Sequence, residues 1–326
     1  MIFQEPINPN TYVLYHADCN DGIGAALAAY NRLRDAATYI PIQYGHRPPK
    51  LNLEGADVYI LDFCYDKDIV LDMRSKAKRV TVIDHHDTNQ KKVEGLDDVI
   101  FDMTKSGAVL AWEFFNPDAY IPLLLKHIQD RDLWKFEYSE SRFTAAYLKF
   151  NRLRFKSDLE HIKHLAFVFL SEKGDQHLEE HTHAIGRPIH GYLDYKAKDI
   201  ADKQKFKKVY FEDYQFAFYN QIDDISETAA AIYNAHDVDG TLSYFIKHDK
   251  VIFSLRSKKI NVREIAEKWT GGGHDKASGF TLPLGEGLEL IKDLYGSTEK
   301  GFFAKLTKWL DFMDVYSSDK KEVSDD

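Results

Sequence analysis

The chain has 326 residues, of which 44% are hydrophobic and 29% charged, a composition typical of globular proteins with one large or two ordinary domains. Its 43 basic and 52 acidic residues give a formal net charge of −9, which argues against tight binding to long duplex nucleic acid. No apolar run approaches a membrane span, the first residues lack the layout of a secretion signal, and the chain has only two cysteines. We therefore expect a cytoplasmic protein without a membrane anchor or a disulfide framework.

The first half of the chain alternates strand and helix patterns. β-branched and apolar runs predict strands over 11–16, 38–44, 57–63, 79–84 and 97–102, and Pro41 marks 38–44 as an edge strand. Helices are predicted over 22–34, 68–77 and 106–115, the last with Ser106 as N-cap. This alternation predicts an α/β fold with a doubly wound parallel sheet, covered by helices on both faces.

The second half of the chain lacks this regular alternation of strand and helix patterns. Residues 121–205 are predicted to be mostly helical, 208–220 to be strand-like, 242–257 to form a hairpin turning near His248–Lys250, and 261–269 to form a helix with Asn261 as N-cap. We expect an N-terminal domain over 1–174, a helical linker over 175–205, a smaller mixed α/β domain over 206–297, and a C-terminal helix with a polar acidic tail over 298–326.

Acids and histidines follow three of the predicted strands. The first strand runs into "YHADCNDG", the third contains "ILDF" and the fourth runs into "VIDHHD". Because the carboxyl ends of parallel strands meet at one edge of a sheet, these side chains can gather there, together with Asp130 or Asp132 of "HIQDRDLW". Clustered carboxylates repel one another unless a cation lies between them, and oxygen ligands mixed with imidazole suit Mn²⁺ or Mg²⁺. Two such ions can activate a water and hold a phosphoryl group, which predicts cleavage of a phosphate ester.

Each piece has a simpler interpretation. A single aspartate at a strand end is more often a turn or helix cap, so only the joint occurrence favours a site. His177 and His181 lie four residues apart without an evident third ligand, so we do not expect a second metal site there. Cys19 and Cys64 are interpreted as small buried side chains. The six lysines of 195–208 form either a solvated helix face, which we favour, or a basic wall beside an anionic ligand.

Together these motifs resemble the DHH phosphoesterase superfamily, in the subgroup that carries a C-terminal DHHA1 domain. "VIDHHD" resembles the motif that names the superfamily, "YHADCNDG" the first motif and "ILDF" the second. "GGGHDKASGF", preceded by "FSLRS", resembles the DHHA1 signature, and the match spans most of residues 11–285 in the expected order. "YHADCNDG" and "QDRDLW" look most like NrnB-type nanoRNases, which are related to RecJ-type exonucleases.

The resemblance implies an active site in the cleft between the two domains that holds two Mn²⁺ ions, with Mg²⁺ as a possible substitute. The implied metal ligands are His16, Asp18, Asp21, Asp62, His85 and Asp130, with Asp62 bridging the two ions. Asp84 and His86 are the implied catalytic residues, and the implied substrate-binding residues are Arg256, Gly271, Gly272, Gly273 and His274. The first motif carries an extra residue, Asn20, and we choose Asp130 over Asp132 because it is nearer the end of its predicted helix.

We predict a Mn²⁺-dependent phosphodiesterase that hydrolyses short oligonucleotides (nanoRNA, dinucleotides) to mononucleotides. The acidic net charge fits a short substrate, since a long polyanion would need a continuous basic track. The alternatives are a cyclic dinucleotide phosphodiesterase, an inorganic pyrophosphatase, and a non-catalytic nucleotide-binding scaffold. The sequence leaves cleavage polarity, the preference for RNA or DNA, and the oligomeric state open.

Overall fold

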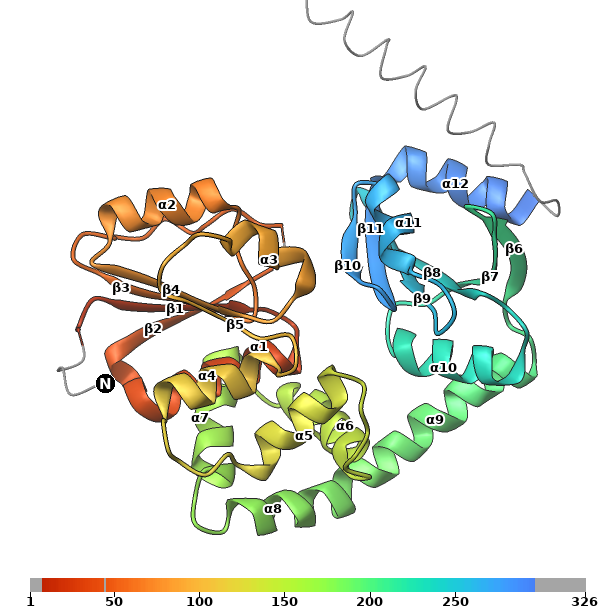
Figure 1. Cartoon of the computed structure of the whole chain (residues 1–326). Coiled ribbons are helices and arrows are strands. Elements are labelled where there is room, and N and C mark those ends of the chain that lie inside the picture. Colours follow the sequence, from red (N-terminus) through yellow and green to blue (C-terminus); the bar gives the residue numbers. More distant parts are fainter. Residues whose placement is uncertain (1–7, 44, 297–326) are drawn as a thin grey trace, which may run out of the picture. The chain divides into compact units, whose positions relative to one another are not determined.

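The computed structural model describes residues 8–43 and 45–296 of the chain (Figure 1). These residues pack into two compact units, one ending at Tyr192 and the other beginning at Leu193. The division falls inside helix α9 (Arg187–Asp202), within the stretch 175–205 for which we predict a helical linker. The predicted domain limits stay predictions, and the C-terminal helix and tail expected over 298–326 lie outside the described residues.

The first unit is built on a sheet of five parallel strands, as predicted. The strand order is β2-β1-β3-β4-β5, and the bounds are β1 Thr11–His16, β2 Ala37–Ile42, β3 Asp57–Leu61, β4 Arg79–Asp84 and β5 Val99–Phe101. Each predicted strand is confirmed to within two residues, and Pro41 does lie on an edge strand. The chain order reverses at β1, which pairs with β2 on one side and β3 on the other. Ligands of open parallel sheets bind at the carboxyl ends of the strands beside such a reversal.

Helices cover both faces of this sheet (Figure 1). Helices α1 (Asn20–Leu33) and α4 (Gly107–Phe115) lie on one face, and α2 (Lys67–Lys76) and α3 (Asp87–Val93) lie on the other. Successive strand residues alternate between two cores, so that Val13 and Tyr15 pack on the α1 side while Leu14 packs on the α2 side. Sequence reasoning missed α3 because "DTNQKKV" contains a single apolar residue and therefore shows no helical periodicity.

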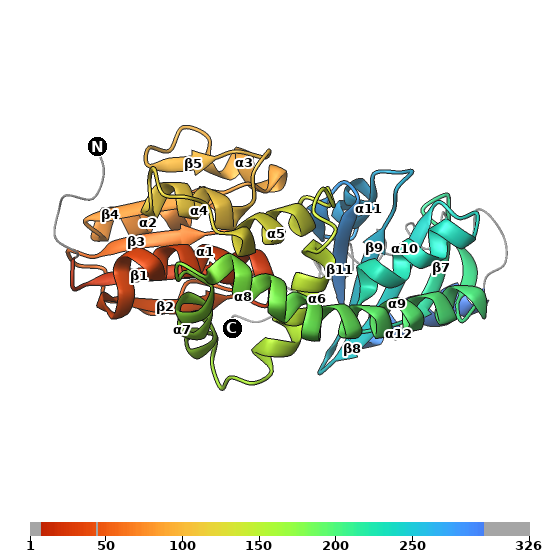
Figure 2. The ribbon, with the colours of Figure 1, turned by 90° about the horizontal axis from the view of Figure 1, so that it is seen from below.

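The rest of the first unit is helical, which confirms the prediction for 121–205. Its helices are α5 Leu123–Asp132, α6 Ser141–Arg152, α7 Asp158–Phe169 and α8 Gly174–His181. A π-helical turn, η2 (Thr182–Gly186), joins α8 to α9, so the chain is helical almost without a break from 174 to 202 (Figure 2). No described helix combines the length and hydrophobicity needed to cross a lipid bilayer.

One histidine of this helical region belongs to the apolar core. His161 of α7 is 1% exposed, and neither of its ring nitrogens has a hydrogen-bond partner within the described part of the chain. Its ring stacks on Phe155 at a centroid distance of 5.3 Å and an interplanar angle of 20°. Burial, helped by the charges of Arg152 and His164, lowers the pKa of His161 to about 4. The neutral imidazole therefore suits this position, and protonation works against the fold.

In the described part of the second unit, the second half of α9 is followed by a mixed six-stranded sheet and three further helices. The strand order is β10-β11-β9-β8-β7-β6, with bounds β6 Lys207–Phe211, β7 Tyr214–Asn220, β8 Gly240–Lys247, β9 Lys250–Arg256, β10 Gly272–His274 and β11 Ala277–Pro283. The helices are α10 Ile225–Ala235, α11 Val262–Lys268 and α12 Leu284–Gly296. The predicted hairpin of 242–257 is confirmed as β8 and β9, and the N-cap Asn261 is confirmed by its hydrogen bond from the Arg263 amide.

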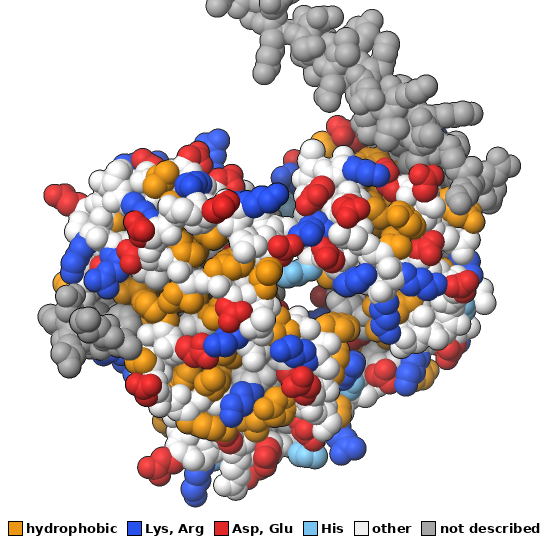
Figure 3. Space-filling view, in the orientation of Figure 1, with side chains coloured by type: hydrophobic (Ala, Val, Ile, Leu, Met, Phe, Trp, Pro, Cys, Tyr) orange, Lys and Arg blue, Asp and Glu red, His pale blue; other side chains and the backbone are white. Residues whose placement is uncertain are grey.

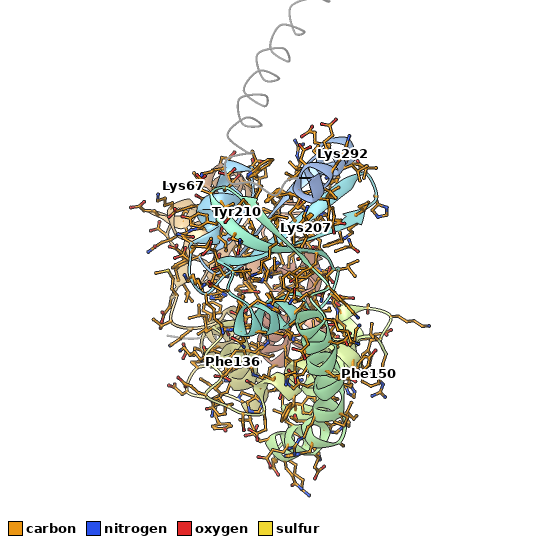
Figure 4. The ribbon with its side chains drawn as sticks, turned by 90° about the vertical axis from the view of Figure 1, so that its right-hand side faces the viewer. Lys67, Phe136, Phe150, Lys207, Tyr210 and Lys292 are labelled. Atoms are coloured by element: carbon orange, nitrogen blue, oxygen red, sulfur yellow. The ribbon has the colours of Figure 1, made fainter. Side chains whose placement is uncertain are left out.

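Two features of this unit differ from the sequence prediction. The strand-like stretch 208–220 divides into β6 and β7 at Glu212–Asp213, where both residues adopt positive φ and turn the chain (Lys207 and Tyr210 of β6 are labelled in Figure 4). Two consecutive positive φ angles are typical of a tight hairpin turn, but neither residue is the usual asparagine or glycine. The glycine-rich stretch, for which we predicted no element, forms a hairpin of β10 and β11.

Candidate metal centre

The predicted strand-end residues of the first unit do meet. His16 ends β1, Asp62 directly follows β3 and His85 directly follows β4, and these three strands are neighbours in the sheet. His16 Nδ1 lies 3.4 Å from Asp62 Oδ2, and His85 Nε2 lies 3.3 Å from Asp62 Oδ1. Asp62 therefore lies between His16 and His85, with one carboxylate oxygen near each.

The surroundings of Asp62 are unusual for a structural residue. It is 1% exposed, its backbone has φ +63°, and neither carboxylate oxygen accepts a hydrogen bond from the described residues. Burial alone would raise the pKa of Asp62, but the imidazoles of His16, His85 and His86 outweigh burial and lower this pKa. An ionised, buried carboxylate whose nearest partners are imidazoles at 3.3–3.4 Å is costly unless those imidazoles are protonated or a metal cation binds it.

Asp21 is held in place by the start of helix α4. Its two carboxylate oxygens accept hydrogen bonds from the amides of Gly107 (2.6 Å) and Ala108 (3.0 Å), and Oδ2 lies 3.5 Å from His85 Nε2. Burial, followed by the negative charges of Asp62 and Asp132, raises the pKa of Asp21. Carboxylates that raise one another's pKa in this way are typical of sites where a metal ion replaces the protons.

The fourth predicted ligand needs a correction. Asp132, and not Asp130, reaches the group: Asp132 Oδ2 lies 3.6 Å from His85 Nε2. Asp130 is buried, and its carboxylate accepts hydrogen bonds from the amides of Glu137 (2.7 Å) and Tyr138 (3.3 Å). Asp130 therefore shapes the loop that follows α5.

The first motif needs a second correction. Asp18 does not join the group, because its side chain is 62% exposed and its Oδ1 lies 2.7 Å from Arg152 Nη2. Cys19 lies there instead, with its sulfur among the nitrogen and oxygen atoms of His16 and Asp62, so our interpretation of Cys19 as a packing residue was incomplete. Cys64 does fill the core and is buried. Burial, and then the nearby carboxylates, raises the pKa of the Cys19 thiol when no cation is bound.

Asp84 and His86 form the supporting part of the site. Asp84 is fully buried, and its Oδ1 lies 2.7 Å from His86 Nδ1 and accepts a hydrogen bond from the His85 amide at 2.8 Å. Its Oδ2 accepts a hydrogen bond from Asn89 at 2.7 Å. Asp84 thus fixes the His86 ring through Nδ1 and leaves Nε2 as the nitrogen that can meet a ligand. Asn89, on the unpredicted helix α3, carried no signal in the sequence beyond its place five residues after Asp84.

The donor set fits divalent metal ions. Among the described residues, three sets of side chains could each hold a metal ion, and within each set the ligating atoms lie within 4.8 Å of one another. The sets are His16 with Cys19 and Asp62, Asp62 with His85 and His86, and Asp21 with His85 and Asp132. The exposed fractions of the side chains indicate a floor and a rim. The floor is Asp21, Asp62 and His85, at 1–3%, and the rim is His16, His86 and Asp132, at 22–25%. A site of carboxylates and imidazoles that opens on one side can hold hard or intermediate cations and admit an anion.

The second unit places Arg256 and His274 in one row. Arg256 of β9 pairs with Ala277 of β11, which pairs with His274 of β10, so the side chains of these residues project from the same face of the sheet. The Arg256 guanidinium donates to Ser226 Oγ at 3.1 Å and to the Leu255 carbonyl at 2.8 Å.

The three glycines of this hairpin differ in what they allow. A Cβ at Gly271 would lie 2.1 Å from the Gly279 carbonyl oxygen, and one at Gly273 would lie 2.6 Å from the Ala277 carbonyl oxygen. These two glycines are therefore needed for the approach of β10 to β11. A Cβ at Gly272 would face open space, so packing does not explain why this residue is a glycine. Gly272 is therefore the one of the three whose backbone a ligand can approach.

Sequence reasoning missed a group of hydroxyls on the same face. Tyr219, Thr241 and Ser243 are buried, and their hydroxyls have no hydrogen-bond partner among the described residues. Thr241 pairs with Arg256 across β8 and β9, and Ser243 pairs with Tyr219 across β7 and β8. Threonine and serine two residues apart within the apolar run of β8 were the only signal in the sequence.

Two other candidate sites gain no support. Among the described residues, no group of three metal-ligating side chains includes His177 or His181, whose Nδ1 atoms lie 3.3 Å and 2.7 Å from backbone carbonyl oxygens. Of the six lysines of 195–208, Lys198, Lys203 and Lys205 form local ion pairs, which favours a solvated face for that part, whereas Lys207 and Lys208 lie in β6.

Comparison with known proteins finds a family match in the second unit. The model of the DHHA1 domain family matches residues 215–298. Uncharacterized protein R106 of Acanthamoeba polyphaga mimivirus is 27% identical over 296 residues, which cover 83% of this chain and 67% of that protein. Among solved structures, the pGpG-specific phosphodiesterase PggH from Vibrio cholerae is 13% identical (86% of this chain, 96% of that chain, TM-score 0.43), and RecJ with Mn²⁺ from Thermus thermophilus is 13% identical (86% and 51%, TM-score 0.45).

Proposed function

Since this chain carries a DHHA1 domain and a DHH motif and so belongs to the DHH/DHHA1 superfamily, we propose that it is a metal-dependent phosphodiesterase that hydrolyses short oligonucleotides and dinucleotides to mononucleotides. The observation that carries the proposal is the group around Asp62. Acids and imidazoles from three neighbouring strand ends, together with Asp132, surround a buried carboxylate whose oxygens accept no hydrogen bond from the described residues.

The residues of the first unit suit the binding of two Mn²⁺ ions, with Mg²⁺ as an alternative. His16, Cys19, Asp62, Asp21, His85 and Asp132 would hold them, and the two carboxylate oxygens of Asp62, one near His16 and one near His85, support a bridging role. When bound, the ions supply Lewis acidity to the phosphoryl group and lower the pKa of a water. Asp130 and Asp18 are left out of this ligand set because their carboxylates are occupied elsewhere.

The remaining chemistry is assigned to His86. Asp84 holds the His86 ring at Nδ1, and with 22% of the side chain exposed, Nε2 can meet a phosphoryl oxygen or the leaving oxygen. Burial by itself would lower the pKa of His86, but the hydrogen bond to Asp84 and the charges of Asp84 and Asp62 raise it. His86 is thereby suited to donate a proton to an oxygen that gains negative charge during cleavage.

We further propose that the second unit binds the far end of the substrate. Arg256 and His274 project from one face beside the open position of Gly272 and the hydroxyls of Thr241 and Tyr219. A guanidinium, an imidazole and hydroxyls are groups that bind phosphate and ribose oxygens. Figure 3 shows acidic side chains interspersed with basic ones on this face of each unit, and together with the net charge of −9 this supports a short substrate.

Hydrolysis assays with Mn²⁺ test the proposal. We expect release of mononucleotides from labelled dinucleotides and from oligomers of up to about five nucleotides, with 24-mers cleaved much more slowly. Cyclic dinucleotides and inorganic pyrophosphate belong in the same panel, because faster hydrolysis of either would replace the proposed substrate class. Equal rates on dinucleotides and 24-mers would contradict the proposed length preference.

Two variants separate chemistry from substrate binding. Asp84→Ala should abolish hydrolysis, because it releases the His86 ring and leaves buried donors unpaired. His274→Ala should mainly raise KM, whereas His248→Ala, at an exposed histidine of the β8–β9 turn, should behave like the wild type. If His274→Ala also behaves like the wild type, the role assigned to the second unit is wrong. A wild-type protein that neither gains stability with Mn²⁺ nor hydrolyses any member of the panel would point to a non-catalytic scaffold.

A further inference from the structure

The loop that follows helix α5 carries two aromatic residues close in sequence to Asp132, a residue of the candidate metal centre. Asp132 ends α5 and lies 3.6 Å from His85, and Trp134 and Phe136 follow within four residues (Phe136 is labelled in Figure 4). Two residues of chain span at most about 7 Å, so the backbone of Trp134 starts next to the rim of the centre. None of the catalytic roles assigned above uses these rings.

The backbone of this loop is held in an unfavourable conformation. Trp134 has φ +57° and Phe136 has φ +55°, values that bulky side chains rarely adopt. Hydrogen bonds to Asp130 maintain it: the Asp130 carbonyl accepts from the Lys135 amide at 2.9 Å, and its carboxylate accepts from the Glu137 amide at 2.7 Å. Backbone strain of this kind is commonly found at ligand-binding sites, since a residue that serves only packing can adopt a conformation of lower energy.

The two rings form one surface with two arginines. The rings of Trp134 and Phe136 meet edge to face at a centroid distance of 4.9 Å. The guanidinium carbon of Arg131 lies 4.1 Å from the Trp134 ring centroid, and that of Arg142 lies 3.6 Å from the Phe136 ring centroid.

A core role does not account for this surface, because Trp134 remains 38% exposed. An exposed indole with a guanidinium stacked on it resembles the surfaces on which proteins stack nucleobases. Such a stacking surface accepts any nucleobase, because stacking uses the face of the base and not its edge.

We propose that Arg131, Trp134, Phe136 and Arg142 form a stacking subsite for the nucleobase next to the scissile phosphate. This inference rests on the proposed function and deepens it, because it adds a contact with the base of the nucleotide at the scissile phosphate to the contacts with phosphate and ribose. Inorganic pyrophosphate has no group that could use the subsite. Asp130 supports the subsite by holding the loop, while Asp132 on the same turn of chain serves the metal centre.

The test compares a dinucleotide with analogues in which one base, at either end, is replaced by hydrogen. Trp134→Asn removes the indole ring, and asparagine is chosen because it tolerates the positive φ of this position. We expect its KM for the intact dinucleotide to rise by about tenfold to a hundredfold. Its KM for one of the two abasic analogues should equal that of the wild type, because that analogue has already lost the stacking contact.

Tyr120→Leu is the matched control. Tyr120 is also exposed under a cation, with Lys126 Nζ 4.1 Å from its ring centroid, but it precedes the other end of α5. The ten residues of that helix separate the two positions by about 15 Å. This variant should leave all the KM values unchanged.

The outcomes separate this inference from the proposed function. Equal effects of Trp134→Asn on the intact dinucleotide and on both abasic analogues would assign Trp134 a structural role and overturn the subsite. If the wild type hydrolyses none of them, the proposed function fails, and calorimetric titration decides the subsite. The wild type should then bind adenosine 5′-monophosphate more tightly than ribose 5-phosphate, and Trp134→Asn should abolish the difference. Equal binding of the two ligands by the wild type would overturn the inference.

Discussion

Replacing Gly107 by alanine should disable the metal centre while the fold survives. A Cβ at this first residue of α4 would lie 2.7 Å from both Cβ and Oδ1 of Asp62. Carbon atoms in contact are ordinarily about 3.5–4.0 Å apart, so the two groups must separate by roughly 1 Å. Neither can yield easily, because Asp62 is 1% exposed and the Gly107 amide is hydrogen-bonded to Asp21 at 2.6 Å.

The expected magnitudes follow from that displacement. Overpacking of this kind costs about 1–3 kcal/mol, which lowers the midpoint of thermal unfolding by a few degrees. A misplacement near 1 Å in a catalytic group lowers rates by about a hundredfold. We therefore expect Gly107→Ala to fold, to lose about a hundredfold in dinucleotide hydrolysis, and to lose most of the stabilisation that Mn²⁺ gives the wild type in thermal unfolding.

Gly191→Ala provides the matched control. Gly191 is a helical glycine of α9 whose added Cβ meets nothing within 4 Å, so alanine there should raise stability by up to about 1 kcal/mol and leave hydrolysis unchanged. Wild-type turnover in Gly107→Ala, together with a wild-type response to Mn²⁺, would refute the placement of Asp62 in the metal centre.

Three further predictions follow from side chains around the centre and in the helical region. Cys19→Ser should weaken Mn²⁺ binding, measured by calorimetry, by on the order of tenfold. Asp18→Asn should leave Mn²⁺ binding unchanged, because Asp18 is exposed and paired with Arg152. A larger loss of affinity in Asp18→Asn than in Cys19→Ser would contradict the geometry. Asp132→Asn should weaken Mn²⁺ binding by a similar factor, while Asp130→Asn should instead lower stability to urea by about 1–2 kcal/mol. Equal losses of affinity in the two variants would contradict the placement of Asp132, and not Asp130, in the centre. The pKa of His161 is lowered to about 4 from its ordinary 6.5, so its contribution to stability is complete above pH 6.5 and is lost as the pH falls from 6.5 to 4. Urea unfolding should show up to about 3 kcal/mol of this loss, and His161→Leu should remove it; an unchanged pH dependence in the variant would refute the assignment.

The strand-end part of the site could be predicted because it depends on topology alone. β-branched runs identify β1, β3 and β4, and alternation with helices makes them parallel. Parallel neighbours end at one edge, so His16, Asp62 and His85 converge whatever their rotamers are. The same reasoning identified the hairpin of β8 and β9 and the cap of α11, since both depend on residues close in sequence.

The choice among residues within a motif was beyond such reasoning. Asp130 and Asp132 lie two positions apart on α5, so their side chains project about 200° apart around the helix axis. Which one faces the centre depends on how α5 is rotated against its neighbours. Asp18 and Cys19 are adjacent, and the positive φ of Asp18 turns its side chain toward Arg152 and leaves the cysteine at the centre.

The sequence by itself determined which strands carry acids and histidines, because hydrophobic periodicity and chain order are local properties that survive without knowledge of packing. Only the tertiary structure decided which oxygen, nitrogen or sulfur atoms point inward, and it brought Trp134 and Phe136 together beside Asp132. The physical reason is that a ligand set is chosen by distances of a few ångströms, and these depend on helix rotation and on single backbone dihedrals that no sequence period encodes.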